Sequence, residues 1–219
     1  MIENLNAIDQ DLLLAINGLH CHYFDAFMWL MSRAWAYVLV ALGFLYVAYR
    51  QGWKQMLLIL VALALTIALA DQISSGVIKP LVQRLRPTHN EDIGSLLHIV
   101  NSYRGGLYGF VSSHAANSFG AAVLLALLFR NRSVTMILLA WAATISYSRM
   151  YMGVHYPGDI ICGAAVGAVS AYLFYRILIA VCHKTRLKVD FAARDAKVMT
   201  LATISNVIAL LIVAIFFEI

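Results

Sequence analysis

Apolar residues in this chain come in long blocks that are separated by short polar connections. A helix needs about 20 mostly apolar residues to cross a bilayer, and a composition of 62% hydrophobic and 12% charged residues provides enough of them for several crossings. The pattern predicts six transmembrane helices, at about residues 27–49, 56–78, 112–129, 134–151, 157–181 and 199–217. We therefore predict an all-α fold, a polytopic membrane helical bundle, that forms one domain over residues 1–219.

The N-terminal residues 1–23 follow a different pattern, in which Leu and Ile alternate with Asn, Asp and Gln. This amphipathic pattern is typical of a helix that lies in the membrane interface, and Asn17 and Gly18 mark its expected end. No residue of this segment points to chemistry. The segment lacks the basic region and the small-residue cleavage site of a signal peptide, so we expect the first span to direct membrane insertion.

The distribution of the basic residues matters more than the net charge of +5. In a soluble protein this charge would suggest nucleic acid binding, which we do not expect here. By the positive-inside rule, connections rich in Lys and Arg face the cytoplasm, so the connections at 79–110 and 152–156 and both termini should face the exterior. The connections assigned to the cytoplasm are the three that must share one side if all six spans are real. Their basic residues are Arg50 and Lys54; Arg130 and Arg132; and Lys184, Arg186, Lys188, Arg194 and Lys197.

The external connection at 79–110 contains the longest polar stretch, residues 88–110. A connection of this length in a compact protein is often a lid or a binding loop, and Arg104 within it is a candidate for contact with a substrate head group. The spacing of its acidic and imidazole side chains matches no specific metal site, and the three cysteines predict neither a disulfide framework nor a zinc site. These residues are His89, Glu91, Asp92 and His98, with Cys21, Cys162 and Cys182.

The strongest chemical signal lies in residues 148–159, between two apolar blocks. Pro157 suits the first turn of a helix, which places His155 just before that helix and Asp159 in its first turn. A carboxylate that binds one ring nitrogen of a histidine fixes the tautomer and makes the other nitrogen a better nucleophile or base. Arg149 adds a planar cation that suits bidentate phosphate binding.

A second cluster of basic residues follows the second span. The residue before a proline is disfavoured in a helix, so the span should end or kink at Lys79. Lys79 and Arg86 are seven residues apart and would share one face of a helical segment, whereas Arg84 would point elsewhere. An ordinary cluster attracted to lipid head groups is the alternative.

Within the second span, Asp71 is either part of a functional site, because buried charge is costly, or a hydrogen-bonding residue of the bundle.

The third cluster opens the span at 112–129. Ser112 or Ser113 is a good N-cap, and the free N–H groups of a helix N-terminus form an anion site. His114 in the first turn then suits a general acid. On the predicted topology the three clusters meet at the external face. Cations, hydroxyl groups and backbone N–H groups make a site for a phosphate monoester, which carries about −1.5 to −2 charges.

These residues resemble the type 2 phosphatidic acid phosphatase (PAP2) superfamily, whose signature has three parts: K-x6-R-P, P-S-G-H and S-R-x5-H-x3-D. The first part matches at Lys79, Arg86 and Pro87. The second part departs from the pattern, because Val111 replaces its proline and Ser113 its glycine, although the serine and histidine positions are kept. The third part matches in full, at Ser148, Arg149, His155 and Asp159.

The resemblance implies a PAP2-like core and a role for each motif residue. His155 would attack phosphorus to form a phosphohistidine, Asp159 would orient it, and His114 would protonate the leaving group. The phosphoryl oxygens would be held without a metal ion or other cofactor by a set of five residues: Lys79, Arg86, Ser112, Ser113 through its N–H, and Arg149.

The resemblance also implies the substrate class, which is a lipid phosphate. Its members act on undecaprenyl diphosphate, phosphatidylglycerol phosphate, phosphatidate, sphingoid phosphates or lipid A. We expect a phosphatase of the bacterial inner membrane that faces the periplasm, with the bilayer as its other partner. Phosphotransfer to another lipid and, more remotely, transport through the bundle remain alternatives, and the sequence leaves the oligomeric state open.

Overall fold

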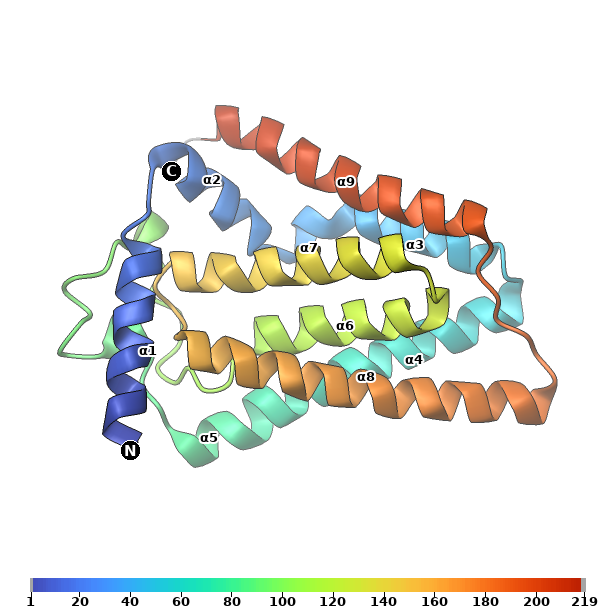
Figure 1. The fold of residues 1–219 in the computed structure, drawn as a ribbon, viewed down its shortest axis with the longest axis horizontal. Coiled ribbons are helices and arrows are strands. Elements are labelled where there is room, and N and C mark those ends of the chain that lie inside the picture. Colours follow the sequence, from blue (N-terminus) through green and yellow to red (C-terminus); the bar gives the residue numbers. More distant parts are fainter. Residues whose placement is uncertain (1, 218–219) are drawn as a thin grey trace.

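The computed structural model describes residues 2–217, and the fold in this range is helical (Figure 1). Its only β-type pairing is an isolated bridge between Leu85 and Tyr108. The predicted all-α class is therefore confirmed for the described residues. The long helices are α1 (Ile2–Asn17), α2 (His22–Met31), α3 (Val38–Tyr49), α4 (Trp53–Asp71), α6 (Ser113–Phe129), α7 (Arg132–Tyr151), α8 (Pro157–Thr185) and α9 (Ala193–Phe216).

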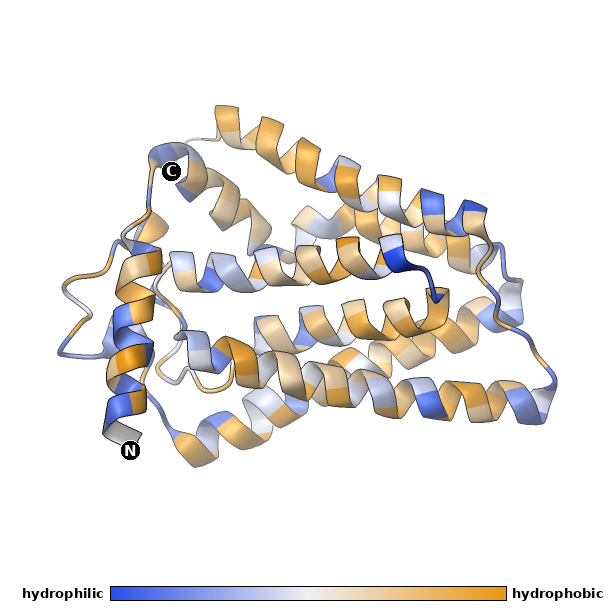
Figure 2. Ribbon diagram, viewed as in Figure 1, coloured by the Kyte–Doolittle hydropathy of each residue, from blue (hydrophilic) through white to orange (hydrophobic). Residues whose placement is uncertain are grey.

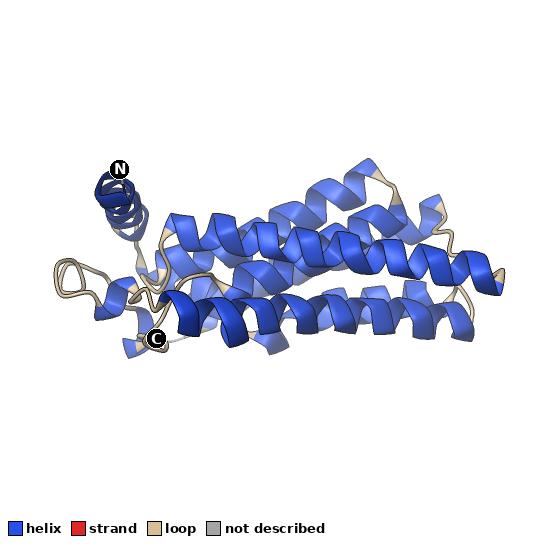
Figure 3. Cartoon of the chain, turned by 90° about the horizontal axis from the view of Figure 1, so that it is seen from below, coloured by secondary structure: helices blue, strands red, loops and turns tan. Residues whose placement is uncertain are grey.

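Among the described residues, three helices are long and apolar enough to cross a membrane: Trp53–Val82, α8 and α9. The pair His22–Met31 and Ala34–Tyr49 passes the same test only when taken together, and α6 is a shorter apolar helix of 17 residues. These helices and α7 lie side by side in one bundle (Figures 1 and 3). The chain is thus a membrane protein by its helices, while the number of six crossings stays a prediction.

The first predicted span, residues 27–49, is not one straight helix. It bends by 78° between α2 and a short 3-10 turn, Ala34–Tyr37, that leads into α3. Arg33 has an extended backbone at the break, with φ −98° and ψ 134°. Ser32, which ends α2, is buried there and donates its hydroxyl to the carbonyl of Trp29.

The second span also differs from the prediction, because the helix does not end or kink at Lys79. It continues through a π-helical segment, Gln72–Ile78, into the short helix α5 (Lys79–Val82). The wider turn changes the hydrogen-bonding register just before Pro80, which cannot donate a backbone N–H. The helix ends where Gln83 takes a left-handed conformation, φ 52°, and donates its N–H to the carbonyl of Lys79.

Helices α6 and α8 cross closely through small residues. A Cβ atom built on Gly167 would lie 2.1 Å from the carbonyl oxygen of Ala116, and one built on Gly163 would lie 2.5 Å from that of Ser112. Side chains at these positions would separate the backbones, so glycine allows this close packing. This crossing fixes the start of α6 against the start of α8.

Helix α1 runs across one end of the bundle rather than along it (Figures 1 and 3). It ends at Asn17, as the sequence predicted, and the buried side chain of Asn17 donates to the carbonyls of His98 and Tyr151. The connections α3–α4, α6–α7 and α8–α9 lie at the opposite end, where polar residues gather (Figure 2). The basic connections and α1 are therefore at opposite ends of the molecule.

Candidate active site

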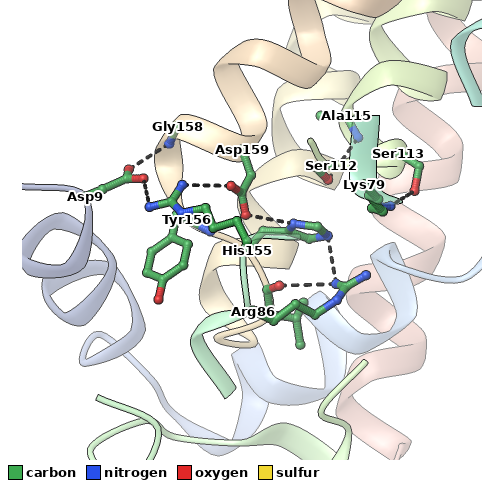
Figure 4. Close-up of polar contacts among 12 residues, drawn as sticks. Asp9, Lys79, Arg86, Ser112, Ser113, Ala115, His155, Tyr156, Gly158 and Asp159 are labelled. Carbon is green, nitrogen blue, oxygen red and sulfur yellow. Dashed lines mark hydrogen bonds and ion pairs between the residues drawn. The ribbon is translucent and has the colours of Figure 1, made fainter. Parts of the chain in front are cut away.

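His155 and Asp159 form a buried pair at the start of α8 (Figure 4). The helix begins at Pro157 with Tyr156 as its N-cap, as Pro157 predicted. This turn brings the Asp159 carboxylate to 3.2 Å from Nδ1 of His155, and both side chains are at most 1% exposed. The carboxylate also accepts the backbone N–H of Tyr156 at 3.1 Å. The pair therefore has the geometry of a histidine oriented by a carboxylate.

The second ring nitrogen of His155 faces Arg86. Nη1 of Arg86 lies 2.8 Å from Nε2 of His155 and donates to the carbonyl of Val154 at 3.2 Å. Because a guanidinium can only donate, Nε2 accepts and Nδ1 carries the proton that binds Asp159. Burial and then the nearby cations, Arg86 first and Arg149 second, lower the pKa of His155 well below its usual 6.5. The imidazole is therefore neutral, with its lone pair at Nε2.

Two arginines crowd this site without enough counter-charge. Arg86 and Arg149 are 9% and 2% exposed, and the Nε atom of each has no hydrogen-bond partner among the residues described. Burial first, and Arg149 second, lower the pKa of Arg86. Within residues 2–217, the one hydrogen bond of the Arg149 side chain is long, 3.4 Å from Nη2 to the hydroxyl of Tyr103. An anion that binds both guanidinium groups would satisfy these donors and relieve the repulsion.

The start of α6 supplies hydroxyl groups and backbone N–H groups. Ser112 is the N-cap, its Oγ accepts from Ala115 N at 3.4 Å, and its own N–H donates to the carbonyl of Asp159 at 3.0 Å. Lys79 donates to Oγ of Ser113 at 3.0 Å. The structure thus brings the three predicted clusters together, although they are separated by long stretches of sequence.

The path by which Lys79 and Arg86 converge differs from the prediction. They do not share a helical face, because α5 ends at Val82 and the chain is then extended, with the bridge at Leu85. Alternate residues of an extended segment point the same way, so Arg84 and Arg86 both face the dyad. Nη1 of Arg84 binds Oδ1 of Asp159 at 2.9 Å. The expectation that Arg84 points elsewhere is therefore wrong.

Helix α1 also contributes a residue, Asp9, where the sequence indicated no chemistry. Its Oδ2 accepts from Nη2 of Arg84 at 2.7 Å, and its Oδ1 accepts the backbone N–H of Gly158 at 2.7 Å (Figure 4). One aspartate among several polar residues of an amphipathic helix gives no local signal of such contacts. Only its place opposite the start of α8 reveals them.

The loop before α6 packs closely against Arg86. Gly105 has a positive φ of 70°, and a Cβ atom there would lie 3.1 Å from Nη1 of Arg86. A Cβ atom on Gly109 would lie 3.0 Å from Oδ2 of Asp159. These two glycines allow the backbone to approach the site. Arg104 instead binds within the loop, where Nη1 donates to the carbonyl of Thr88 at 3.0 Å.

A cavity of about 370 Å³ opens beside His114 and Ser113. Asp71 lines this cavity and accepts a hydrogen bond from Nδ2 of Asn117 at 3.2 Å. Both interpretations of Asp71 therefore have support, because it forms a hydrogen bond within the bundle and also faces a cavity beside the site. A second cavity of about 370 Å³ has almost entirely apolar walls. The two share three lining residues: Tyr37, Ala121 and Trp141.

The histidines of the loop that could be imagined as metal ligands contact other groups. His98 lies 3.0 Å from a carboxylate oxygen of Asp25 and stacks on His20, and His89 lies 3.4 Å from the carbonyl oxygen of Gly105. Within the described range, 2–217, no group of three or more His, Cys, Asp or Glu side chains is placed to hold a metal ion.

Comparison with known proteins identifies relatives over most of the chain. The model of the PAP2 superfamily matches residues 55–181. The chain is 46% identical to the lipid A 4'-phosphatase of Bacteroides thetaiotaomicron over 179 residues, which are 81% of this chain and 80% of that one. It is 35% identical to the lipid A 4'-phosphatase of Porphyromonas gingivalis over 177 residues, 80% and 75% of the two chains.

One solved structure has a similar fold. The crystal structure of Aquifex aeolicus LpxE aligns with a TM-score of 0.53 and 23% identity, and the alignment covers 76% of this chain and 93% of that chain. At this identity the likeness concerns the fold alone.

Proposed function

The chain belongs to the PAP2 superfamily and is a membrane lipid phosphatase, and from this premise we propose that it removes the 4'-phosphate of lipid A at the external face of a bacterial inner membrane. The observation that carries the proposal is the identity of 46% and 35% to two lipid A 4'-phosphatases over four fifths of the chain. The site supports it, since a neutral buried histidine faces cations that have unused donors.

The first chemical step forms a phosphohistidine. Nε2 of His155 attacks phosphorus, and Asp159 holds the proton on Nδ1 and stabilises the positive ring that forms. In the structure Arg86 occupies the lone pair of Nε2, so its guanidinium turns to a phosphoryl oxygen when substrate binds. Arg149, Lys79, the hydroxyl of Ser112 and the N–H groups at the start of α6, that of Ser113 included, hold the remaining charge.

The leaving group departs on the side of His114. In an in-line displacement the nucleophile and the leaving oxygen lie on opposite sides of phosphorus, and His114 borders the cavity that extends away from the dyad. As the bond from phosphorus to the sugar oxygen breaks, His114 gives that oxygen a proton. The mainly apolar walls of this cavity and its neighbour suit a lipid.

The second step releases phosphate. Water attacks the phosphohistidine, the bond from phosphorus to nitrogen breaks, and His114 takes the proton of the water by the reverse of its first role. His155 returns to its neutral form. The cations and N–H groups supply the charge stabilisation in both steps, so the reaction proceeds without a metal ion.

The arrangement of the bundle supports an external site. The basic connections α3–α4, α6–α7 and α8–α9 gather at one end, and the site lies at the other (Figure 1). The positive-inside rule assigns the basic end to the cytoplasm. The dyad then faces the periplasm.

The test is phosphate release by purified protein in detergent with EDTA. Lipid A, phosphatidate, phosphatidylglycerol phosphate and undecaprenyl diphosphate are compared, with His155→Ala as control, and tandem mass spectrometry locates the phosphate left on lipid A. We expect loss of the 4'-phosphate only, and none with the control. Preference for another lipid would contradict the substrate, and turnover by His155→Ala would contradict the nucleophile.

A further inference from the structure

Two charged residues that are not among the fixed positions of the three motifs connect helix α1 to the dyad. Asp9 binds Nη2 of Arg84 at 2.7 Å, Arg84 binds Asp159 at 2.9 Å through Nη1, and Asp159 binds His155 at 3.2 Å. The side chains of Asp9 and Arg84 are 13% and 22% exposed, whereas that of Asp159 is 0% exposed. The series runs from the surface helix to the imidazole ring of His155 (Figure 4).

Arg84 is placed to hold protein groups rather than the phosphate. Its two terminal nitrogens bind carboxylates of Asp9 and Asp159, and its guanidinium lies over the ring of Tyr156 at 4.0 Å. Arg86 and Arg149, in contrast, have Nε donors that find no partner in the described part of the chain. The arginines near the dyad therefore fall into two groups, one already neutralised by carboxylates and one ready for an anion.

Asp159 depends on Arg84 for its charge. Arg84 is the only cationic side chain that the described residues place at hydrogen-bond distance from this fully buried carboxylate. A buried carboxylate without a cation takes up a proton far more readily. A protonated Asp159 would accept poorly from Nδ1–H of His155 and would no longer stabilise the positive ring of the phosphohistidine step.

Asp9 restrains the same site in two ways. It fixes the side chain of Arg84, and it accepts the backbone N–H of Gly158, which lies between His155 and Asp159 in the chain. A carboxylate near a helix N-terminus is favoured by the free N–H groups and the helix dipole. Helix α1 thus holds both the charge partner of Asp159 and the first turn of α8.

We propose that Asp9 and Arg84 are positioning residues for phosphoryl transfer, which keep Asp159 ionised and turned toward His155, and that helix α1 is thereby part of the active site. The proposal rests on the proposed roles of His155 and Asp159. It does not depend on which lipid is the substrate.

Four variants test the charge and the contact separately. Arg84→Gln removes the charge and keeps a donor, Arg84→Lys keeps the charge, and Asp9→Asn keeps an acceptor for Gly158 but loses the charge. Asp11→Asn is the matched control, because Asp11 is an exposed aspartate on the same helix. Each is purified in detergent and assayed for kcat and KM on the lipid that the wild type hydrolyses best.

We expect Arg84→Gln to lower kcat at pH 7 by about 10- to 100-fold, the range found when a residue that orients a metal-bound histidine is lost, with KM within about twofold. Arg84→Lys should recover part of the loss, and Asp9→Asn should lower kcat by a few-fold. Asp9→Asn combined with Arg84→Gln should be no slower than Arg84→Gln alone, because Asp9 acts mainly through Arg84. Asp11→Asn should match the wild type.

The pH dependence separates positioning from a purely structural role. In Arg84→Gln the ionised form of Asp159 has lost its cation, and buried carboxyl groups without a cation can titrate between about pH 6 and 9. As Asp159 ionises over this range, kcat should rise and approach the wild-type value. A fold defect would not be repaired by alkali. The titratable and charged groups that face Asp159 are His155, Arg84, Arg86, Lys79, Tyr156 and Cys162, with Asp9 beyond Arg84.

The outcomes are distinct. A wild-type kcat in Arg84→Gln, or a loss that is equal at every pH, would overturn the proposal. If Arg84→Gln does not fold, the same profile is measured on Asp9→Asn and Arg84→Lys, and unchanged kcat in both would also overturn it. Inactivity of the wild type on every lipid phosphate would instead count against the proposed function.

Discussion

The crossing of α6 and α8 allows a prediction whose size follows from the structure. In Gly167→Ala, the new Cβ atom would lie 2.1 Å from the carbonyl oxygen of Ala116 and 2.7 Å from the backbone nitrogen of Gly120. Real Cβ contacts are essentially never shorter than 3.0 Å, so the two helices must move apart by about 0.9 Å. Backbone atoms cannot rotate away as a side chain can.

This displacement should affect both stability and catalysis. Forced overpacking costs about 1–3 kcal/mol, and each kcal/mol lowers the melting temperature of a chain of this size by about 2–4 °C. Helix α6 carries His114, and α8 carries Asp159. A misplacement of about 1 Å between catalytic groups can cost about 100-fold in rate, so we expect kcat/KM to fall by about 10- to 100-fold.

The assay measures thermal unfolding in detergent and phosphate release on the same preparation. Gly106→Ala is the matched control, since a Cβ atom there meets nothing within 4 Å, and it should behave as the wild type. Wild-type melting temperature and activity in Gly167→Ala would refute the reasoning, because the two helices would then not depend on this close approach.

Three further predictions concern the site itself. His114→Ala should slow alkyl phosphates far more than p-nitrophenyl phosphate, whose leaving group needs no proton; equal losses would contradict its role as acid. Arg149→Lys should weaken vanadate binding by at least about tenfold, because lysine cannot bind two oxygens in a plane; unchanged binding would exclude Arg149 from the phosphate site. The pKa of His155 is well below 6.5, so His155 stays neutral while the substrate phosphate titrates near pH 6. A plot of log kcat/KM against pH should therefore fall from about pH 6 to 5 with a slope no steeper than about one. A slope of about two would show that His155 also titrates.

The sequence alone was sufficient for the features that depend on neighbouring residues. Apolar blocks of helical length predicted the all-α membrane bundle, and Pro157 predicted the start of α8, which follows the end of α7 at Tyr151. The spacing of His155 and Asp159 predicted that they would meet, because a single turn joins them. Each of these inferences uses forces that act within one helix or at its ends.

The sequence was misleading where the backbone left the expected periodicity. A π-helical segment carries the second span past Lys79, and an extended segment replaces the expected helix before Arg86. Changing from a helical to an extended repeat reverses which residues share a face, so Arg84 joined the dyad instead of pointing away. The bend between α2 and α3 likewise interrupts an apolar block that is continuous in sequence.

Only the tertiary structure determined how distant segments complete the site. Arg84 and Asp159 are 75 residues apart in the chain, and Asp9 and Gly158 are 149 apart. Contacts of this kind leave no periodic trace in a sequence, because each partner satisfies its local pattern equally well without the other. The motifs therefore determined which groups can react, whereas the packing of α1, α6 and α8 determined which charged residues hold them in place.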